Sequence, residues 1–187
     1  MEKKEFAIAD LKVGQLNALV KILGGSDIVM EILRGTREVT TSVRNFIAHI
    51  FSFVVDETMS VENVVKEGKF ERSNDEINCK NFPRLKNGKK FEKEIVLFKF
   101  DRDMWANDVI EEMDRVGYRP ATIWELVALF IREASLAERF HIVALGSSSM
   151  IRGFRRVPFI CRGGKELGLT LGDNCLLEGC LYIAVKK

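Results

Sequence analysis

The sequence predicts an α+β protein with an antiparallel sheet, and three observations support this fold class. From residue 94 onward the order of elements is one strand, two helices and then several strands. The connections between the last strands are too short for the crossovers that parallel strands need. The tail, residues 156–187, alternates leucines with small or polar residues, which indicates strands with one buried face and one free face.

Composition limits the classes of protein to consider. The chain has 187 residues, of which 47% are hydrophobic, so it can bury a substantial core as one main domain with a small appendage. A formal net charge of +2 disfavours a dedicated nucleic-acid binder. Because no signal peptide or membrane-spanning stretch is apparent, we expect a cytoplasmic protein with no membrane contact.

The cysteines and histidines indicate no metal site. No C-x2-C motif is present and the two histidines are isolated, so a structural zinc site is not expected. In a cytoplasmic setting the cysteines are expected to be reduced thiols. They are Cys79, Cys161, Cys175 and Cys180. We therefore expect no cofactor.

Three regions are expected along the chain: a helical module over 1–38, a strand with a polar linker over 39–93, and the main domain over 94–187. The sequence of the first region predicts a helical hairpin, in which Gly24-Gly25 ends the first helix. Its acidic and basic residues are equal in number, which favours a docking or oligomerisation element over a DNA reader. A hairpin that only packs on the main domain is an equally good interpretation.

The second region begins with a strand. Aromatic and β-branched residues at both parities of residues 46–55 predict a buried strand, in which His49 is more often a core residue than a ligand. Residues 56–93 are polar and contain the turn signal Asn87-Gly88, so we expect a linker there. Residues 94–100 (EIVLFKF) predict the first strand of the main domain.

Two helices follow that strand. The first is predicted over residues 105–116, where Trp105, Val109, Met113 and Val116 share one face, and Gly117 ends it. The second begins with Thr122-Ile-Trp-Glu125, the pattern of a capping box. This pattern makes Glu125 a helix cap rather than a catalytic acid. The helix is expected to continue through Ile131, with Leu126, Val127 and Phe130 buried.

The remaining elements are strands. A strand over 141–145 leads into Gly146-Ser-Ser-Ser149, which lacks the lysine and glycine spacing of a phosphate-binding loop. Further strands are predicted over 157–160, 167–171 and 181–185. In the middle strand of these three, the leucines would face the core, while the residues between them would face outward.

Segments of the main domain resemble a known branch of proteins. Residues 117–126, GYRPATIWEL, and the closing strand LYIAV resemble the formylglycine-generating-enzyme branch of the C-type lectin fold, which includes the variable proteins of diversity-generating retroelements. The phrases RPATIWEL, IVALGS, RVP and IAVKK are similar to those of a protein family from candidate-phyla-radiation bacteria, in which GQLNALVKILGG recurs as a separable module. The resemblance covers about residues 11–35 and 94–187.

This resemblance implies a non-enzymatic protein with a C-type-lectin-like domain of an antiparallel sheet and two helices. Such a protein binds a ligand through a hypervariable C-terminal surface, while Leu167, Leu169 and Leu171 act as scaffold. The surface implied here comprises Phe159, Cys161, Arg162, Gly168, Thr170, Gly172, Asp173, Cys175, Leu176 and Cys180. Its Gly, Cys and Leu content favours a partly apolar partner, a protein, and a homo-oligomer is compatible with it. Ordinary surface and loop positions are the simpler alternative.

Two other functions fit parts of the tail. Arg152, Arg155, Arg156 and Arg162, beside Phe154 and Phe159, could contact nucleic acid. Cys175-x4-Cys180 has the spacing of the copper(I) cysteine pair of formylglycine-generating enzymes, although no other catalytic group accompanies it. The tail lacks the carboxylate cluster that calcium would require.

Overall fold

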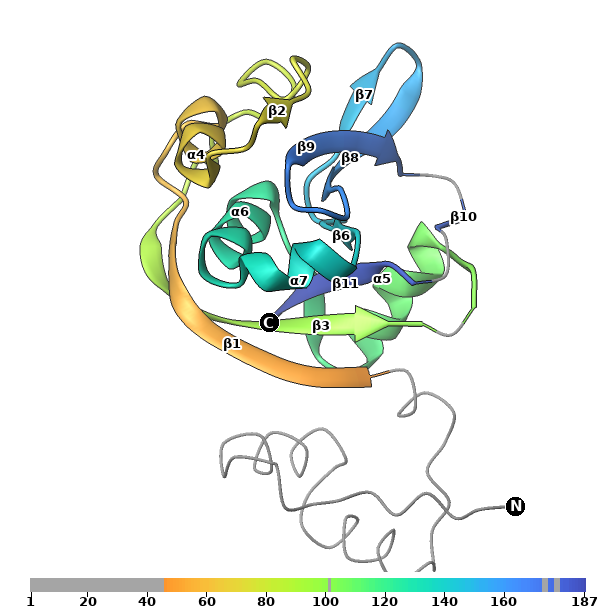
Figure 1. Ribbon diagram of the computed structural model, residues 1–187. Coiled ribbons are helices and arrows are strands. Elements are labelled where there is room, and N and C mark those ends of the chain that lie inside the picture. The colour runs from red at the N-terminus through yellow and green to blue at the C-terminus, as the bar shows by residue number, and fades with distance from the viewer. Residues whose placement is uncertain (1–45, 101, 173–174, 177–178) are drawn as a thin grey trace, which may run out of the picture.

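The computed structural model describes residues 46–100, 102–172, 175–176 and 179–187, with side chains from residue 51 onward except those of Cys175 and Leu176 (Figure 1). The predicted module over 1–38 and the side chain of His49 lie outside the described residues. Within them, the chain forms a mixed α+β structure with a sheet-rich core. None of the helices in these ranges is long and apolar enough to cross a membrane.

Four helices and eleven strands make up the described part of the chain. The helices are α4 (Val61–Gly68), α5 (Ala106–Arg115), α6 (Ile123–Arg132) and α7 (Ala134–Arg139). The strands are β1 (Phe46–Asp56), β2 (Arg72–Ser73), β3 (Lys90–Lys99), β4 (Met104–Trp105), β5 (Tyr118–Pro120), β6 (Ile142–Val143), β7 (Ser149–Ile151), β8 (Phe154–Ile160), β9 (Glu166–Leu171), β10 (Cys175–Leu176) and β11 (Leu181–Lys186).

The main sheet has the strand order β1-β3-β11-β6-β8-β9-β2, with β5 also paired to β11 and β7 to β8. Most of these pairings are antiparallel, as predicted, but β11 with β6 and β2 with β9 are parallel. The sheet is therefore mixed. The prediction considered only the short connections between consecutive strands, whereas β6 and β11 are separated by β7, β8 and β9, which supply the long return path.

Helices cover both faces of the centre of the sheet. Ile95, Leu97 and Ile183 belong to a buried cluster, called here the cluster under α6, together with residues of α4, α6 and α7. Figure 1 shows α6 and α7 above β3 and β11. Val96 and Tyr182 belong to a second cluster, which includes buried residues of α5. The central strands are continuous apolar runs because neither face is left to solvent.

The segment expected to be a polar linker contributes to the core. Ser60 caps α4 by accepting a hydrogen bond from the Asn63 amide at 3.4 Å. Val61 and Val64 of this helix lie in the cluster under α6, and so do Ile77 and Phe82. The next short strand, β2, pairs with β9. The segment folds because a few spaced apolar residues reach the core, even though charged residues dominate its composition.

Both helices predicted for the main domain are present, but their ends differ from the predicted ends. Val109 and Met113 of α5 are fully buried, whereas Trp105 and Val116 are 57% and 40% exposed, because they lie just outside the helix. Gly117 ends this helix with φ of 84°. The capping box of α6 is confirmed, since the Thr122 amide donates to Glu125 Oε2 at 2.6 Å.

Candidate ligand-binding surface

The hairpin of β8 and β9 places several of the predicted surface residues on one face. The register pairs Phe159 with Gly168 and Val157 with Thr170. Ile160 and Leu167, which alternate with them, are 0% exposed and belong to the cluster under α6. Phe159, Gly168 and Thr170 therefore share the opposite face, on the α5 side of the sheet.

The glycines of this face are not open positions. Gly168 is buried, and a Cβ atom at this position would lie 2.7 Å from the Phe159 ring. Gly172 is also buried, and its Cβ atom would lie 2.9 Å from Cγ1 of Val157. Among the predicted residues on β8 and β9, Phe159 and Thr170 are therefore the ones that offer a partly exposed side chain.

The leucines of β9 differ in burial. Leu167 is 0% exposed, as expected for a scaffold residue. Leu169 and Leu171 lie on the same face but are only partly buried. In the strand order, only β2 follows β9, and β2 pairs with it only at Glu166 and Leu167, so the rest of β9 forms an edge of the described sheet.

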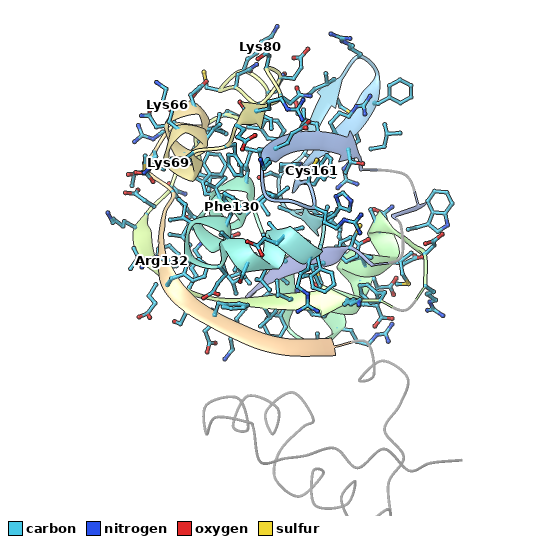
Figure 2. All side chains as sticks on the ribbon, in the orientation of Figure 1. Lys66, Lys69, Lys80, Phe130, Arg132 and Cys161 are labelled. Atoms are coloured by element: carbon cyan, nitrogen blue, oxygen red, sulfur yellow. The ribbon has the colours of Figure 1, made fainter. Side chains whose placement is uncertain are left out.

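The turn after β8 carries Cys161, which is labelled in Figure 2, followed by Arg162. The Arg162 backbone N–H donates to Nδ1 of His141 at 3.2 Å, and the His141 ring lies 6.0 Å from the Phe159 ring, centroid to centroid. Burial raises the pKa of Cys161, and the charge of Glu166 raises it further. Cys161 is therefore a protonated thiol at neutral pH. His141 is a member of this surface that sequence reasoning missed, because only the register of β6 brings it there.

The last predicted residues lie beside α5. Strand β10 pairs with β4 so that Cys175 is opposite Trp105. Trp105 is a large, exposed aromatic residue at this ribbon. Asp173 lies outside the described residues. Cys180 packs against the cluster under α5.

Of the two cysteines of the copper alternative, the structure describes the side chain of Cys180. Burial raises the pKa of Cys180, as does the charge of Asp103, so this thiol is not activated toward the thiolate that copper(I) prefers. The side chain of Cys175 lies outside the described atoms. In the described part of the chain, no group of three or more His, Cys, Asp or Glu side chains is placed to hold a metal ion.

The arginines of the nucleic-acid alternative do not form one basic patch. Arg152 forms an ion pair with Glu76, with a distance of 3.6 Å between Nη2 and Oε1. Arg156 lines the same hollow as Asp75 and Glu76, so acidic groups face it. Arg162 follows the opposite end of β8. A phosphate backbone would meet carboxylates beside these arginines, which weakens this alternative.

A buried ionic cluster was not predicted from the sequence. The Lys93 side chain, 4% exposed, contacts Glu57 and donates to Glu125 Oε1 at 2.6 Å. Arg119 donates to both oxygens of Glu125, at 2.6 Å and 3.1 Å. Burial alone would raise the pKa of Glu125, but Arg119, Lys93 and the Thr122 amide together lower it. Glu125 is thus a fully paired carboxylate rather than a free acid. The sequence did contain a signal for Lys93: it lies two residues before the buried Ile95 on the same strand, so its side chain points to the same buried face.

No protein-family model, curated protein or solved structure matches this chain.

Proposed function

We propose that this protein binds a protein ligand, without catalysis, in the manner of the diversified variable proteins that it resembles. The binding face, called here the β8–β9 surface, is built on Phe159, Cys161, Arg162 and Thr170, with Gly168 and Gly172 as its buried backbone positions. The resemblance also assigns Asp173, Cys175, Leu176 and Cys180 to the binding face. One observation carries this proposal. Strands β8 and β9 are anchored on one face by Ile160 and Leu167, so the partly exposed Thr170 on the opposite face and the exposed Arg162 in the turn after β8 can vary in sequence without loss of the fold.

The order and pairing of the elements support a C-type-lectin-like scaffold for this surface. Strand β3 opens the main domain and pairs with β11, the last strand in chain order. Between them the chain forms α5, α6 and then the strands β6 to β9. This is the order of strand, helices and strands that the resemblance implies, with the variable segment between β8 and β11.

Trp105 supports a protein as the ligand. It is 57% exposed and lies opposite Cys175 in the β4–β10 pairing, so it is next to one of the positions that the resemblance assigns to the binding face. Exposed tryptophans are enriched among the residues that contribute most to protein–protein binding, because they bury a large area at a small cost in side-chain entropy. Trp105 would be a fixed anchor beside the variable positions.

The geometry restricts which positions can vary independently. A side chain at Gly168 requires the Phe159 ring to move or to be replaced by a smaller group, since the two residues face each other across the β8–β9 pairing. We therefore expect diversification at Thr170, Cys161 and Arg162 to be independent. Changes at Gly168 should occur together with changes at Phe159.

Sequencing this gene across its natural population tests the proposal. Amino-acid changes should concentrate at the β8–β9 surface, while Leu167 and Ile160 stay constant. Residues 90–132 of the same gene provide the internal control for the background substitution rate. If Thr170, Cys161 and Arg162 vary no more than this control region, the diversified-binder proposal is wrong.

A further inference from the structure

A hollow of about 570 Å³ lies on the face of β9 opposite the β8–β9 surface. Leu169, which alternates with Gly168 and Thr170 along the strand, lines it. The other lining residues are Ser73, Asn74, Asp75, Glu76, Ile151, Arg152 and Arg156. This volume is in the range of sites that take small molecules, roughly 300–1,000 Å³.

The walls of the hollow are held by specific contacts. On one side, the Asn74 amide donates to the Leu167 carbonyl at 3.0 Å, which ties the segment after β2 to β9. Glu76 accepts a hydrogen bond from the Asn81 side chain at 3.0 Å. On the other side is the tight β7–β8 hairpin, whose turn residues Arg152 and Gly153 have φ of 53° and 80°. Figure 1 shows this hairpin projecting beside the loop that follows β2.

Charged side chains of both signs line the hollow, and two of them have no ion-pair partner among the described residues. Glu76 and Arg152 form an ion pair with each other across it. Among the described residues, the Asp75 carboxylate and the Arg156 guanidinium have no ion-pair partner, although Arg156 lies 5.7 Å from the centre of the Phe154 ring. A guanidinium can bind a carboxylate through two parallel hydrogen bonds, and a carboxylate attracts an ammonium group.

The hollow also has an apolar part. Ile151 is 8% exposed and Leu169 is partly buried, and both contribute to the lining. An apolar group placed against them would be removed from water. The site therefore combines an anion-binding group, a cation-binding group and an apolar wall.

We propose that this hollow binds an α-amino-acid zwitterion with an apolar side chain, either free or as a short peptide. The ligand carboxylate would contact Arg156, its ammonium group would contact Asp75, and its side chain would lie against Ile151 and Leu169. This inference does not depend on the proposed function, because it uses the other face of the hairpin.

A titration with leucine and its analogues tests the ligand chemistry. L-leucine, added to the ¹⁵N-labelled full chain up to about 10 mM, should shift the amide resonances of residues 73–76, 151–156 and 169 in NMR spectra. Leucinamide lacks the carboxylate and N-acetyl-leucine lacks the ammonium group, so each should bind at least about tenfold more weakly. Tighter binding of the Leu-Leu dipeptide assigns the site to peptides, and tighter binding of leucine assigns it to free amino acids.

Substitutions of Arg156 and Asp75, the two charged residues without an ion-pair partner among the described residues, test the site itself. Arg156→Gln and Asp75→Asn should each weaken leucine binding at least about tenfold without changing the melting temperature of the protein. The matched controls are Arg84→Gln and Asp108→Asn, which change exposed residues outside the hollow and should bind leucine normally.

Two results would overturn the proposal. One is the absence of shifts at these amides for every ligand at the highest concentration. The other is equal binding of leucine and N-acetyl-leucine, which would show a simple anion site at Arg156. If a substitution lowers the melting temperature, the comparison of leucine with its two analogues on the unmodified chain decides by itself.

Discussion

At the scale of single residues, Lys93 connects parts of the chain that are far apart in sequence. Its ammonium group contacts Glu57, just after β1, and Glu125, in the first turn of α6. Burying such charges is costly, so the cluster is tolerated because each group is hydrogen-bonded and the two carboxylates are matched by Lys93 and Arg119. Removing one member leaves a buried charge without compensation.

Replacing Lys93 should therefore destabilise the protein strongly. We expect Lys93→Met to lower the free energy of unfolding by about 3–5 kcal/mol, measured by urea denaturation at pH 7. The matched control is Lys90→Met on the same strand, where the lysine is exposed and its ion pair with Asp56 spans 3.4 Å. This control should change stability by less than about 1 kcal/mol. Equal effects of the two substitutions would contradict the structural role of Lys93.

The lowered pKa of Glu125 predicts a loss of stability in acid. Because this pKa lies below its ordinary value of 4.5 in the folded state, the stabilisation is complete above that pH and is lost as the pH falls through the folded-state pKa. In the Glu125→Gln variant, the free energy of unfolding should be lower at pH 7 and should fall less steeply between about pH 5 and pH 3. Identical slopes for variant and parent would argue against this assignment.

The contact between Gly168 and Phe159 predicts a coupled pair of substitutions. Gly168→Ala should cost about 1–2 kcal/mol, because the new methyl group overlaps the Phe159 ring and this strain exceeds the gain from replacing glycine. Phe159→Leu should remove most of that cost, so the double variant should be more stable than the sum of the single effects indicates. Thermal unfolding of all three variants measures the coupling. Additive effects would mean that the ring yields freely.

At the scale of elements, α4 is the clearest addition that the structure makes. Its last residue is followed by Lys69, which caps the helix with φ of 50° and ψ of 38°, a left-handed conformation that favours glycine. Figure 2 shows Lys66 and Lys69 on the outside of this helix. A side chain at the cap is therefore tolerated rather than required.

Substitution at this cap should raise stability. Lys69→Gly should increase the free energy of unfolding by up to about 1 kcal/mol, because glycine adopts the left-handed conformation without strain. Lys66→Gly, inside the last turn of the same helix, is the control and should lower it by about 1 kcal/mol. Chemical denaturation of both variants compares them. A loss of stability in Lys69→Gly would contradict the backbone conformation of the cap.

How well the elements could be predicted depended on how local their signals are. The capping box of α6 needs only Thr122 and Glu125, and the strands β3, β9 and β11 follow from apolar runs or strict alternation, so these were found. Helix α4 has few apolar residues and was missed among charged neighbours. The exposed Trp105 could not be foreseen either, because its position depends on where α5 begins.

For the candidate surface, the sequence predicted only which residues of β9 share a face, from the alternation of its side chains. Period two placed Gly168 and Thr170 on one face and Leu167 on the other. The sequence contains no information about what covers each face, so the burial of Gly168 and Gly172 and the partial exposure of Leu169 were not foreseen. The hollow beside Arg156 was hidden for the same reason, since its other wall comes from residues 73–76.

At the scale of the whole molecule, the sheet joins residues from both halves of the described chain. Phe82 lies between α4 and β3 in sequence, yet it is 3% exposed and belongs to the cluster that also contains Leu167 and Ile183. Residues 46–93 therefore belong to the same packed body as the main domain. We expect this body to unfold as one cooperative unit.

A substitution in the connecting segment tests this unity. Phe82→Ala should lower the free energy of unfolding of the entire body by about 3–5 kcal/mol, with coincident transitions by tryptophan fluorescence and far-ultraviolet circular dichroism. Leu85→Ala, at a residue that is 36% exposed in the same segment, should change stability by about 0.5 kcal/mol or less. Separate transitions by the two probes would show that the segment folds on its own.

The position of β11 also affects how the protein is made in the cell. Strand β11 lies between β3 and β6, so it joins the β1–β3 pair to the β6–β8–β9 part of the sheet. A ribosome synthesises the other described strands of this sheet before β11. The β1–β3 pair and the β6–β8–β9 part therefore lack their shared neighbour until β11 leaves the exit tunnel. The central contacts of the sheet thus form only after β11 has been synthesised, and the nascent chain is a natural client for chaperones until then.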